Sequence, residues 1–333
     1  MGLRVFLTHN AEDRAAYYGR ALPDLQALAD VTVTDRDLSV PELIAASADC
    51  DIIVAHRSTA APSDLFAESP RLLAFLRCAV DISTVDVAAA GRAGVLVARA
   101  AKSFIPSTAE LALALMLDLA RNVSRSTVDY QAGREPPQRP GRQLRGATAG
   151  IIGYGAVGEY LGDLLLALGM RVLVHDPYVV VARDGIASKS LSDLLAEADF
   201  VLPLAQATEE TTNLIGPQEL TAMRPGAVLV NVARGELIDE AAVAAGLADG
   251  TLGGLAMDVG RAPDQRPSPE LAARPGVVAT PHLGGLTPEN ADAQAAGSVE
   301  QVAAIISGHM PPRAVNPEQA TRLVAFWEGL HMT

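Results

Sequence analysis

The stretch 150-GIIGYGAVGEYLGDLLLALGMRVLVHDPY-178 carries the clearest fold signal of the chain. An apolar run ends in glycines, opens into a helical pattern and runs apolar again until it reaches Asp176. Gly153, Gly155 and Gly158 form a G-x-G-x-x-G turn, which alone is weak evidence in a chain with 28 glycines. A strand before the turn, an amphipathic helix after it and an acidic residue about twenty positions later together predict a dinucleotide-binding unit.

The glycines of this turn each have a physical task in such a unit. Gly153 permits the tight turn, Gly155 lets the backbone approach a pyrophosphate, and Gly158 lets the helix pack on the strand. The helix N-terminus adds unpaired N–H groups and a partial positive charge. We therefore expect cofactor contacts from Gly153, Tyr154, Gly155, Ala156, Val157 and Gly158. Asp176, followed by Pro177, would bind both ribose hydroxyls and repel a 2′-phosphate, which favours NAD over NADP.

The composition is that of an acidic globular protein. Its 333 residues carry a formal net charge of −13, so nucleic acid and anionic membranes are poor partners. The two cysteines, and the lack of CxxC or HExxH patterns, predict no structural metal and favour a reducing cytoplasm. The opening MGLRVFLTHN is too short and too quickly polar for a signal peptide, and no apolar run reaches the roughly 18 residues of a membrane span.

Strand and helix patterns alternate along the chain, which favours parallel sheets with helices on both faces. We predict two doubly wound α/β domains with a cleft between them. A flavodoxin-like substrate domain is expected over 1–100 and 288–333, and a Rossmann NAD domain over 101–287. A long apolar helix is expected over 108–133, and its character favours a homodimer. An irregular loop should follow over 134–146, where prolines forbid regular structure.

Two residues at predicted strand ends could carry oxidoreductase chemistry. His282, in 280-TPHLGG-285, ends a strand at the edge where open parallel sheets bind ligands, and an imidazole can exchange a proton with a carbonyl oxygen. Arg234, in 231-NVARGELID-239, ends another strand and offers a planar pair of donors to a carboxylate. A structural histidine and an ordinary surface arginine stay open as alternatives.

Four segments together resemble the D-isomer-specific 2-hydroxyacid dehydrogenase family over nearly the whole chain. They are GYGAVG with Asp176, 225-PGAVLVNVARGELIDEAAV-243, 254-GLAMDV-259 and TPHLGG. Two further segments, 78–95 and 107–121, match the family more loosely. The order and spacing of the four motifs make the resemblance specific.

The resemblance implies a role for each matched residue. His282 would be the acid/base group, and Arg234 would grip the carboxylate and carbonyl of a 2-oxo acid. Backbone amides of Asp81, Ile82 and Ser83 would hold the same carboxylate. The resemblance also implies that the cofactor is contacted by Thr108, Gln206, Thr211, Ala233, Asp258 and Gly284.

The chain departs from the family after Asp258. The family places a Glu there that pairs with the catalytic histidine, but this chain has Pro263, and Asp264 is the next carboxylate. Asp264 could substitute through a shifted loop, another carboxylate could reach in, or His282 could work without this partner. Without it, a smaller fraction of the imidazole is protonated near neutral pH, so we expect a reductase optimum shifted to acid.

The predicted substrate domain departs from the family as well. The carboxylate-binding loop usually contains Gly-x-Gly, where this chain has Ala79, Val80 and Asp81, so we expect the Asp81 carboxylate to point away from an anionic substrate. Arg57 follows a predicted strand end and would suit a second anionic group, such as a phosphate, a phosphonate or a carboxylate. A solvent-exposed arginine is the alternative at this position.

The expected activity is NAD-dependent hydride transfer at C2 of a small 2-hydroxy or 2-oxo acid, in a homodimeric cytoplasmic enzyme. Glyoxylate, hydroxypyruvate and a phosphorylated or phosphonate analogue are the candidate substrates. Two other functions stay open on the same fold. One is a corepressor-type NAD-sensing protein with little turnover, and the other is a dehydrogenase of the formate or phosphite type.

Overall fold

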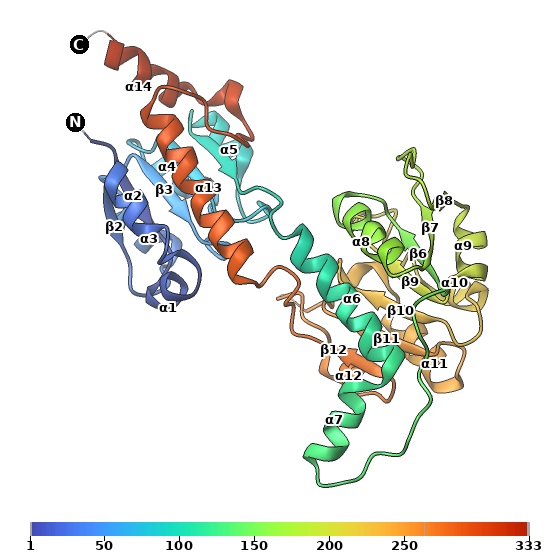
Figure 1. Cartoon of the computed structure of the whole chain (residues 1–333). Helices are drawn as coiled ribbons and strands as arrows, with labels where there is room; N and C mark the ends of the chain where they lie inside the picture. The colour runs from blue at the N-terminus through green and yellow to red at the C-terminus, as the bar shows by residue number, and fades with distance from the viewer. Residues whose placement is uncertain (1, 263, 332–333) are drawn as a thin grey trace. The chain divides into compact units, whose positions relative to one another are not determined.

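The computed structural model describes residues 2–262 and 264–331, and the chain divides into two units. Unit 1 consists of Met1–Ser103 and Pro288–Thr333, and unit 2 of Phe104–Thr287. Each unit holds one parallel sheet flanked by helices (Figure 1). The predicted α/β class with two doubly wound sheets is therefore confirmed. The assignment of substrate and NAD roles to the domains, and the cleft between them, stay predictions.

Unit 1 contains a five-stranded sheet in the order β2-β1-β3-β4-β5. Its strands are β1 (Arg4–Leu7), β2 (Asp30–Val33), β3 (Ile52–Ala55), β4 (Ala74–Arg77) and β5 (Leu96–Arg99). Its helices and helical turns are α1 (Ala11–Asp13), η1 (Arg14–Tyr18), α2 (Leu22–Leu28), α3 (Val40–Ala46), α4 (Ser63–Glu68), α5 (Val87–Arg92), α13 (Pro288–Ile306), η3 (Pro317–Gln319) and α14 (Thr321–His331). This strand order is the flavodoxin-like one, and the chain changes direction between β1 and β3.

Unit 2 contains a seven-stranded sheet in the order β12-β11-β10-β9-β6-β7-β8. Its strands are β6 (Thr148–Ile152), β7 (Arg171–His175), β8 (Ile186–Ser188), β9 (Phe200–Pro203), β10 (Val228–Asn231), β11 (Gly254–Met257) and β12 (Val277–Ala279). Its helices and helical turns are α6 (Ile105–Arg121), α7 (Val123–Gln131), α8 (Ala156–Ala167), α9 (Leu191–Glu197), α10 (Pro217–Ala222), η2 (Gly235–Leu237), α11 (Glu240–Asp249) and α12 (Pro269–Ala272). The strand order reverses at β6 and β9, as in a Rossmann fold.

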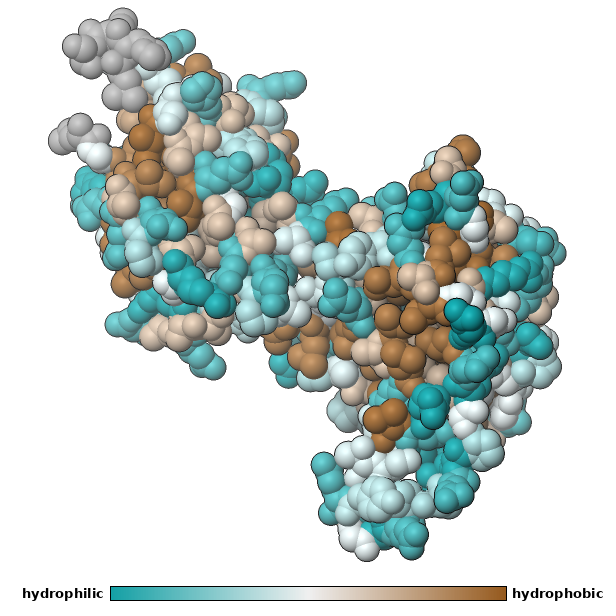
Figure 2. Space-filling model, in the orientation of Figure 1, coloured by the Kyte–Doolittle hydropathy of each residue, from teal (hydrophilic) through white to brown (hydrophobic). Residues whose placement is uncertain are grey.

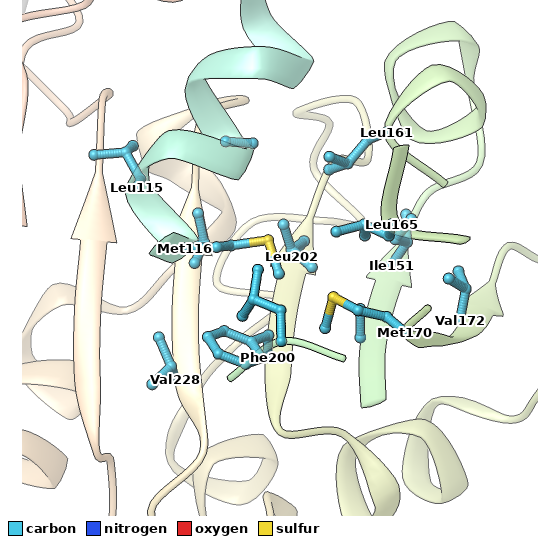
Figure 3. Packing of buried hydrophobic residues seen from close by; sticks show 14 of the residues in the cluster. Leu115, Met116, Ile151, Leu161, Leu165, Met170, Val172, Phe200, Leu202 and Val228 are labelled. Atoms are coloured by element: carbon cyan, nitrogen blue, oxygen red, sulfur yellow. The ribbon is translucent and has the colours of Figure 1, made fainter. Parts of the chain in front are cut away.

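One face of the unit 2 sheet is packed by α6 and α8. Met116 from α6 and Leu165 from α8 meet Phe200 and Leu202 of the central strand β9, and all four side chains are buried (Figure 3). Strands that are buried on both faces read as continuous apolar runs, which is what the sequence shows here. This core holds the strands whose carboxyl ends carry the predicted site.

The predicted single helix over 108–133 is wrong, because it is broken at Asn122. Asn122 has a φ of +55°, a left-handed conformation that Asn tolerates better than most residues, so α6 ends before it and a new helix, α7, starts after it. The predicted loop over 134–146 is confirmed, since it holds no helix or strand. Among the described residues, no helix combines the length and the apolar character that a membrane crossing requires.

Candidate functional site

The glycine turn after β6 has the geometry that its sequence predicts. Gly153 has a φ of +95°, and a Cβ at this position would lie 2.5 Å from the backbone nitrogen of Ala205. A Cβ on Gly158 would lie 2.7 Å from the carbonyl oxygen of Gly153, so α8 can pack on the turn only with glycine there. A Cβ on Gly155 would meet nothing within 4 Å. The structure therefore leaves open space over the middle of the turn.

Asp176 is hydrogen-bonded to the backbone of this turn. Its Oδ2 accepts from the amide of Tyr154 at 2.7 Å, and its Oδ1 accepts from the amide of Tyr178 at 2.9 Å. A carboxylate has about four acceptor positions, so each oxygen keeps capacity for a further donor. Gly155 caps α8 without a side-chain hydrogen bond, so no side chain occupies the N-cap acceptor position at this helix N-terminus.

Arg234 lies in a turn at the carboxyl end of β10. The fully buried Asn231 shapes this turn: its side-chain amide donates to the Arg234 carbonyl at 2.8 Å, and its Oδ1 accepts from the Ala233 amide at 3.1 Å. The exposed Arg234 guanidinium donates to the Ala233 carbonyl, and no carboxylate of the described residues forms an ion pair with it. A Cβ on Gly235 would overlap the carbonyl carbon of Gly260, which explains why glycine follows the arginine.

Asp258 follows β11 and organises the loop after β12. Its carboxylate is fully buried and accepts three hydrogen bonds from that loop. The donors are the Thr280 hydroxyl at 2.6 Å, the Leu283 amide at 2.7 Å and the Gly284 amide at 2.7 Å. His282 sits inside this loop with a φ of +62°, a conformation that a non-glycine residue adopts only where its surroundings require it.

The partner of His282 is a backbone carbonyl. Its Nδ1 lies 3.4 Å from the carbonyl oxygen of Asp264, while the Asp264 carboxylate forms an ion pair with Arg266 at 3.2 Å. Because a carbonyl only accepts, Nδ1 carries the hydrogen in this contact and Nε2 is left to exchange a proton. Asp264 thus meets His282 through its backbone carbonyl, and its role as the carboxylate partner of His282 stays a prediction. Pro263, at the position of the family Glu, lies outside the described residues.

The residues predicted on the cofactor side lie near these groups. Gly284 is buried against α6, where its Cβ position would be 3.3 Å from the Thr108 hydroxyl and 3.1 Å from Oδ2 of Asp258. In the loop after β9, the Thr211 hydroxyl donates to the Gln206 carbonyl at 2.6 Å. The same loop begins at the close contact between Gly153 and Ala205, so it runs beside the glycine turn.

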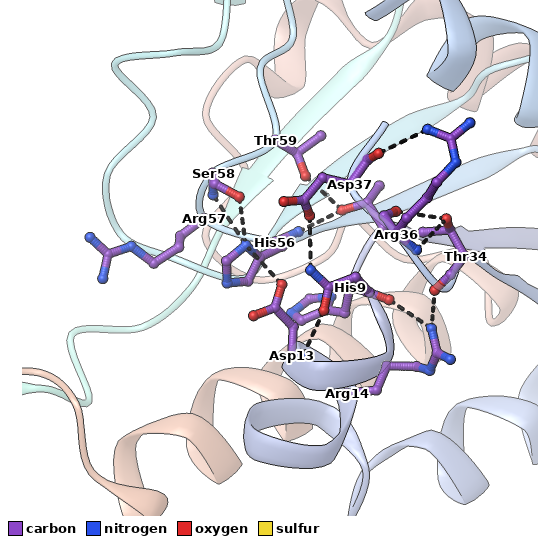
Figure 4. A network of polar contacts seen from close by, with 12 residues as sticks. His9, Asp13, Arg14, Thr34, Arg36, Asp37, His56, Arg57, Ser58 and Thr59 are labelled. Atoms are coloured by element: carbon purple, nitrogen blue, oxygen red, sulfur yellow. Dashed lines mark hydrogen bonds and ion pairs between the residues drawn. The ribbon is translucent and has the colours of Figure 1, made fainter. Parts of the chain in front are cut away.

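The residues predicted for the substrate lie in unit 1. Arg57 is exposed after β3, and its side chain points away from the neighbouring polar network (Figure 4). Oδ1 of Asp81 accepts from the backbone amide of Ser83 at 2.9 Å. One of the amides predicted to hold the substrate carboxylate is therefore engaged by this side chain. Ile82, between them, is half-buried.

Asn231 is not among the residues predicted for the site, although its side chain holds the Arg234 turn. The signal was present in the motif 231-NVARG-235, because a buried amide at a strand end can satisfy turn backbone groups on both sides.

The chain is similar in sequence and in structure to known proteins. Residues 113–284 match the family model described as D-isomer specific 2-hydroxyacid dehydrogenase, NAD binding domain. A glyoxylate reductase from Aeropyrum pernix is 31% identical over 95% of this chain and 96% of its own length. The crystal structure of the TT0316 protein from Thermus thermophilus superposes with a TM-score of 0.83 at 30% identity, over 94% of this chain and all of that one.

Other relatives are longer than this chain. A D-3-phosphoglycerate dehydrogenase from Mycobacterium tuberculosis is 36% identical over 89% of this chain but only 56% of its own length. The chain thus spans little more than half the length of the curated phosphoglycerate dehydrogenases that it matches.

Proposed function

Because this chain belongs to the D-isomer specific 2-hydroxyacid dehydrogenase family, we propose that it transfers a hydride between NAD(H) and C2 of a small 2-hydroxy or 2-oxo acid. The observation that carries the proposal is the placement of Arg234, Asp258 and His282 after three neighbouring parallel strands, β10, β11 and β12. The glycine turn after β6 lies at the same edge, which is where ligands bind in open α/β sheets.

The residues of unit 2 fit NAD, which the matched domain of the family binds. The space over Gly155 leaves room for a pyrophosphate, and the uncapped N-terminus of α8 offers it N–H donors. Asp176 offers acceptors to ribose hydroxyls and disfavours a 2′-phosphate. When bound, this cofactor supplies or accepts the hydride.

His282 would move the proton of the reaction. In the reductive direction its Nε2 gives a proton to the ketone oxygen as C2 receives the hydride, and in oxidation the same atom takes the proton from the hydroxyl. The contact of Nδ1 with the Asp264 carbonyl supports this role, because it orients the ring and leaves Nε2 without a described partner. Asp258 would keep the loop of His282 in shape.

Arg234 would orient the acid. Its guanidinium can donate two parallel hydrogen bonds to a carboxylate, and it can polarise the neighbouring carbonyl. The absence of an ion pair with any carboxylate in residues 2–262 or 264–331 supports this role, because the cation stays available to an anionic ligand.

The substrate class is proposed from the relatives and from Arg57. A glyoxylate reductase and a hydroxypyruvate reductase are among the relatives, so we propose these two acids as substrates. Arg57 in unit 1 would recognise a second anionic group of a phosphorylated or phosphonate analogue. The amides of Asp81, Ile82 and Ser83 would bind the substrate carboxylate that Arg234 also binds, once the Asp81 side chain releases the Ser83 amide.

We propose a homodimer in the cytoplasm. Large side chains with apolar atoms are exposed on α6 and α7 and on or directly after α8 of unit 2: Leu117, Val123, Val128, Tyr130, Tyr160 and Leu168. Figure 2 shows brown surface over α6 and α8. Apolar surface gathered in this way favours a protein interface. Sedimentation of the full chain at micromolar concentration tests this, and a monomer would contradict it.

A panel of 2-oxo acids with NADH, read by NADH absorbance, tests the activity. We expect saturable oxidation of NADH with glyoxylate or hydroxypyruvate. Arg234→Gln should lower kcat/KM about 100-fold, the worth of two charge-assisted hydrogen bonds of about 1.5 kcal/mol each. The melting temperature should not change. Arg274→Gln, at an exposed ion pair with Glu270 in the same unit, is the matched control and should keep full activity.

NADH binding without turnover of any 2-oxo acid would contradict the proposal and favour a sensing protein. Oxidation of formate or phosphite as the sole activity would favour that other class of dehydrogenase.

A further inference from the structure

Arg77, the last residue of β4, is a buried cation outside the proposed chemistry. Its side chain is 1% exposed, which makes it the largest fully buried side chain among the described residues. The four hydrogen bonds of its guanidinium go to uncharged oxygens, and burial lowers its pKa by more than the negative charge of Asp81 acts to raise it. A buried charge is costly unless hydrogen bonds replace the lost water. Its hydrogen bonds therefore indicate why the sequence keeps it.

The guanidinium gathers two separate loops. Its Nη1 donates to the carbonyls of His56 at 2.5 Å and Arg57 at 2.7 Å. Its Nη2 donates to the carbonyl of Thr59 at 2.7 Å and to the hydroxyl of Thr84 at 2.8 Å. One planar group thus holds the 56–59 loop and the end of the 81–84 loop together.

The two loops are those predicted to bind substrate. The 56–59 loop follows β3, at the point where the strand order of unit 1 reverses and where open α/β sheets bind ligands. Because Arg77 donates hydrogen bonds to the carbonyls of this loop, it fixes the backbone that carries the Arg57 side chain. Figure 4 shows that side chain pointing away from its neighbours. Thr84 directly follows Asp81–Ser83, the segment predicted to hold the carboxylate.

We propose that Arg77 is a positioning residue that joins these two loops into one anion-recognition surface and sets substrate affinity without touching the substrate. The proposal rests on the proposed function, because the substrate is the acid discussed above. It adds a residue for which burial excludes direct contact with that acid.

The chemistry of arginine suits this task better than that of other residues. Four acceptors lie around a planar group, and a lysine has only three donors on a single nitrogen. Burial lowers the pKa of Arg77 to about 10, so the group remains a cation at neutral pH. The guanidinium carbon also lies 5.7 Å from the centre of the Phe75 ring, a favourable cation–π distance.

Steady-state kinetics of Arg77→Met and Arg77→Lys test the proposal. Methionine keeps much of the volume and removes every donor. We expect it to raise KM for the 2-oxo acid about 10- to 100-fold, the scale of a misplaced binding group, with kcat and NADH affinity little changed. Lysine should restore part of the affinity. Thr84→Val removes one of the four hydrogen bonds and should raise KM less. It tests the proposal independently if Arg77→Met does not fold.

Arg322→Met is the matched control. Arg322 lies in the same unit and donates to the carbonyls of Ser69 at 2.7 Å and Leu72 at 3.2 Å, before β4 rather than after it. It should lower the melting temperature but leave KM at the wild-type value. A wild-type KM in Arg77→Met, or an equal rise in Arg322→Met, would overturn the proposal.

Hydrogen exchange separates this proposal from the proposed function. In Arg77→Met, amides of both 56–60 and 81–85 should exchange faster than in Arg322→Met. Faster exchange in only one segment, or in neither, would overturn the joining role. If the wild type reduces no 2-oxo acid, the proposed function fails, while the exchange result still decides whether Arg77 joins the loops.

Discussion

The buried carboxylate of Asp258 accepts a hydrogen bond from the backbone amide of Gly284 at 2.7 Å, across the loop that carries His282. Together with the bonds from Thr280 and Leu283, this contact ties the end of β11 to the loop after β12. The left-handed backbone of His282 lies between these donors. The direction of the imidazole therefore depends on a carboxylate that belongs to the neighbouring strand.

Asp258→Asn should raise the activation free energy of the reaction by more than it lowers the free energy of unfolding, so its main effect is a lower kcat. An amide has one acceptor oxygen, so whichever way it turns, its NH2 group faces a backbone N–H of Leu283 or Gly284. The loop must shift, and a displacement of His282 of about 1 Å should cost roughly 100-fold in kcat. Thr280→Val removes one donor and leaves both amides bound, so its loss should be smaller. Unchanged kcat in Asp258→Asn would show that the loop does not depend on the charge.

Asp264→Asn should leave the pH profile of the reductase as it is in the wild type. The structure directs the Asp264 carboxylate to Arg266 and its backbone carbonyl to His282, and the substitution removes only the carboxylate.

His282→Asn should lower kcat about 100- to 10,000-fold, the usual contribution of a general acid/base. Rates measured from pH 5 to 9 at saturating substrate check both variants. A shifted optimum in Asp264→Asn would restore the carboxylate to the mechanism.

Asp176→Asn should weaken the preference for NADH over NADPH. The substitution removes the charge that disfavours a 2′-phosphate, while the amide oxygen can still accept from Tyr154. We expect the ratio of kcat/KM for the two cofactors to fall at least about tenfold. Asp184→Asn, on an exposed residue of the same unit, is the control for the lost negative charge and should keep the ratio. An unchanged ratio in Asp176→Asn would mean that another group selects the cofactor.

The glycine turn could be predicted from sequence because its geometry is local. A positive φ at Gly153, a close contact at Gly158 and an open position at Gly155 all follow from residues within six positions and from the helix that follows. The strand ends of Arg234 and His282 were predictable for a similar reason. Parallel strands share one carboxyl edge, so an apolar run places the residue that ends it.

The contacts of Asp264 and Arg77 could not be predicted in this way. Whether Asp264 shows His282 its carboxylate or its carbonyl depends on the path of an irregular loop and on the competing charge of Arg266. Likewise, a charged residue at the end of β4 is usually exposed, but Arg77 is buried and donates to the 56–59 loop and to Thr84. The end of α6 could not be predicted either, since the helix break at Asn122 depends on one residue in a continuous helical pattern.

His9 should make unit 1 less stable as the pH falls below about 6.5. The ring is 2% exposed, and burial, followed by the charge of His56, lowers its pKa from 6.5 to about 3. Between these values the unfolded chain binds a proton that the folded chain does not, so stability falls with decreasing pH by up to about 1.4 kcal/mol per pH unit. Above pH 6.5 both states are neutral and this contribution is constant.

His9→Phe should reduce this fall of stability with decreasing pH, because phenylalanine keeps a ring against Tyr18 and His56 but binds no proton. Urea unfolding of the full chain from pH 7 to pH 4.5, followed through a probe in unit 1, measures the slope in both proteins. The exposed His309, replaced by Gln, is the control and should leave the slope at its wild-type value. Equal slopes in the wild type and His9→Phe would show that the folded chain takes up a proton at His9 as readily as the unfolded one.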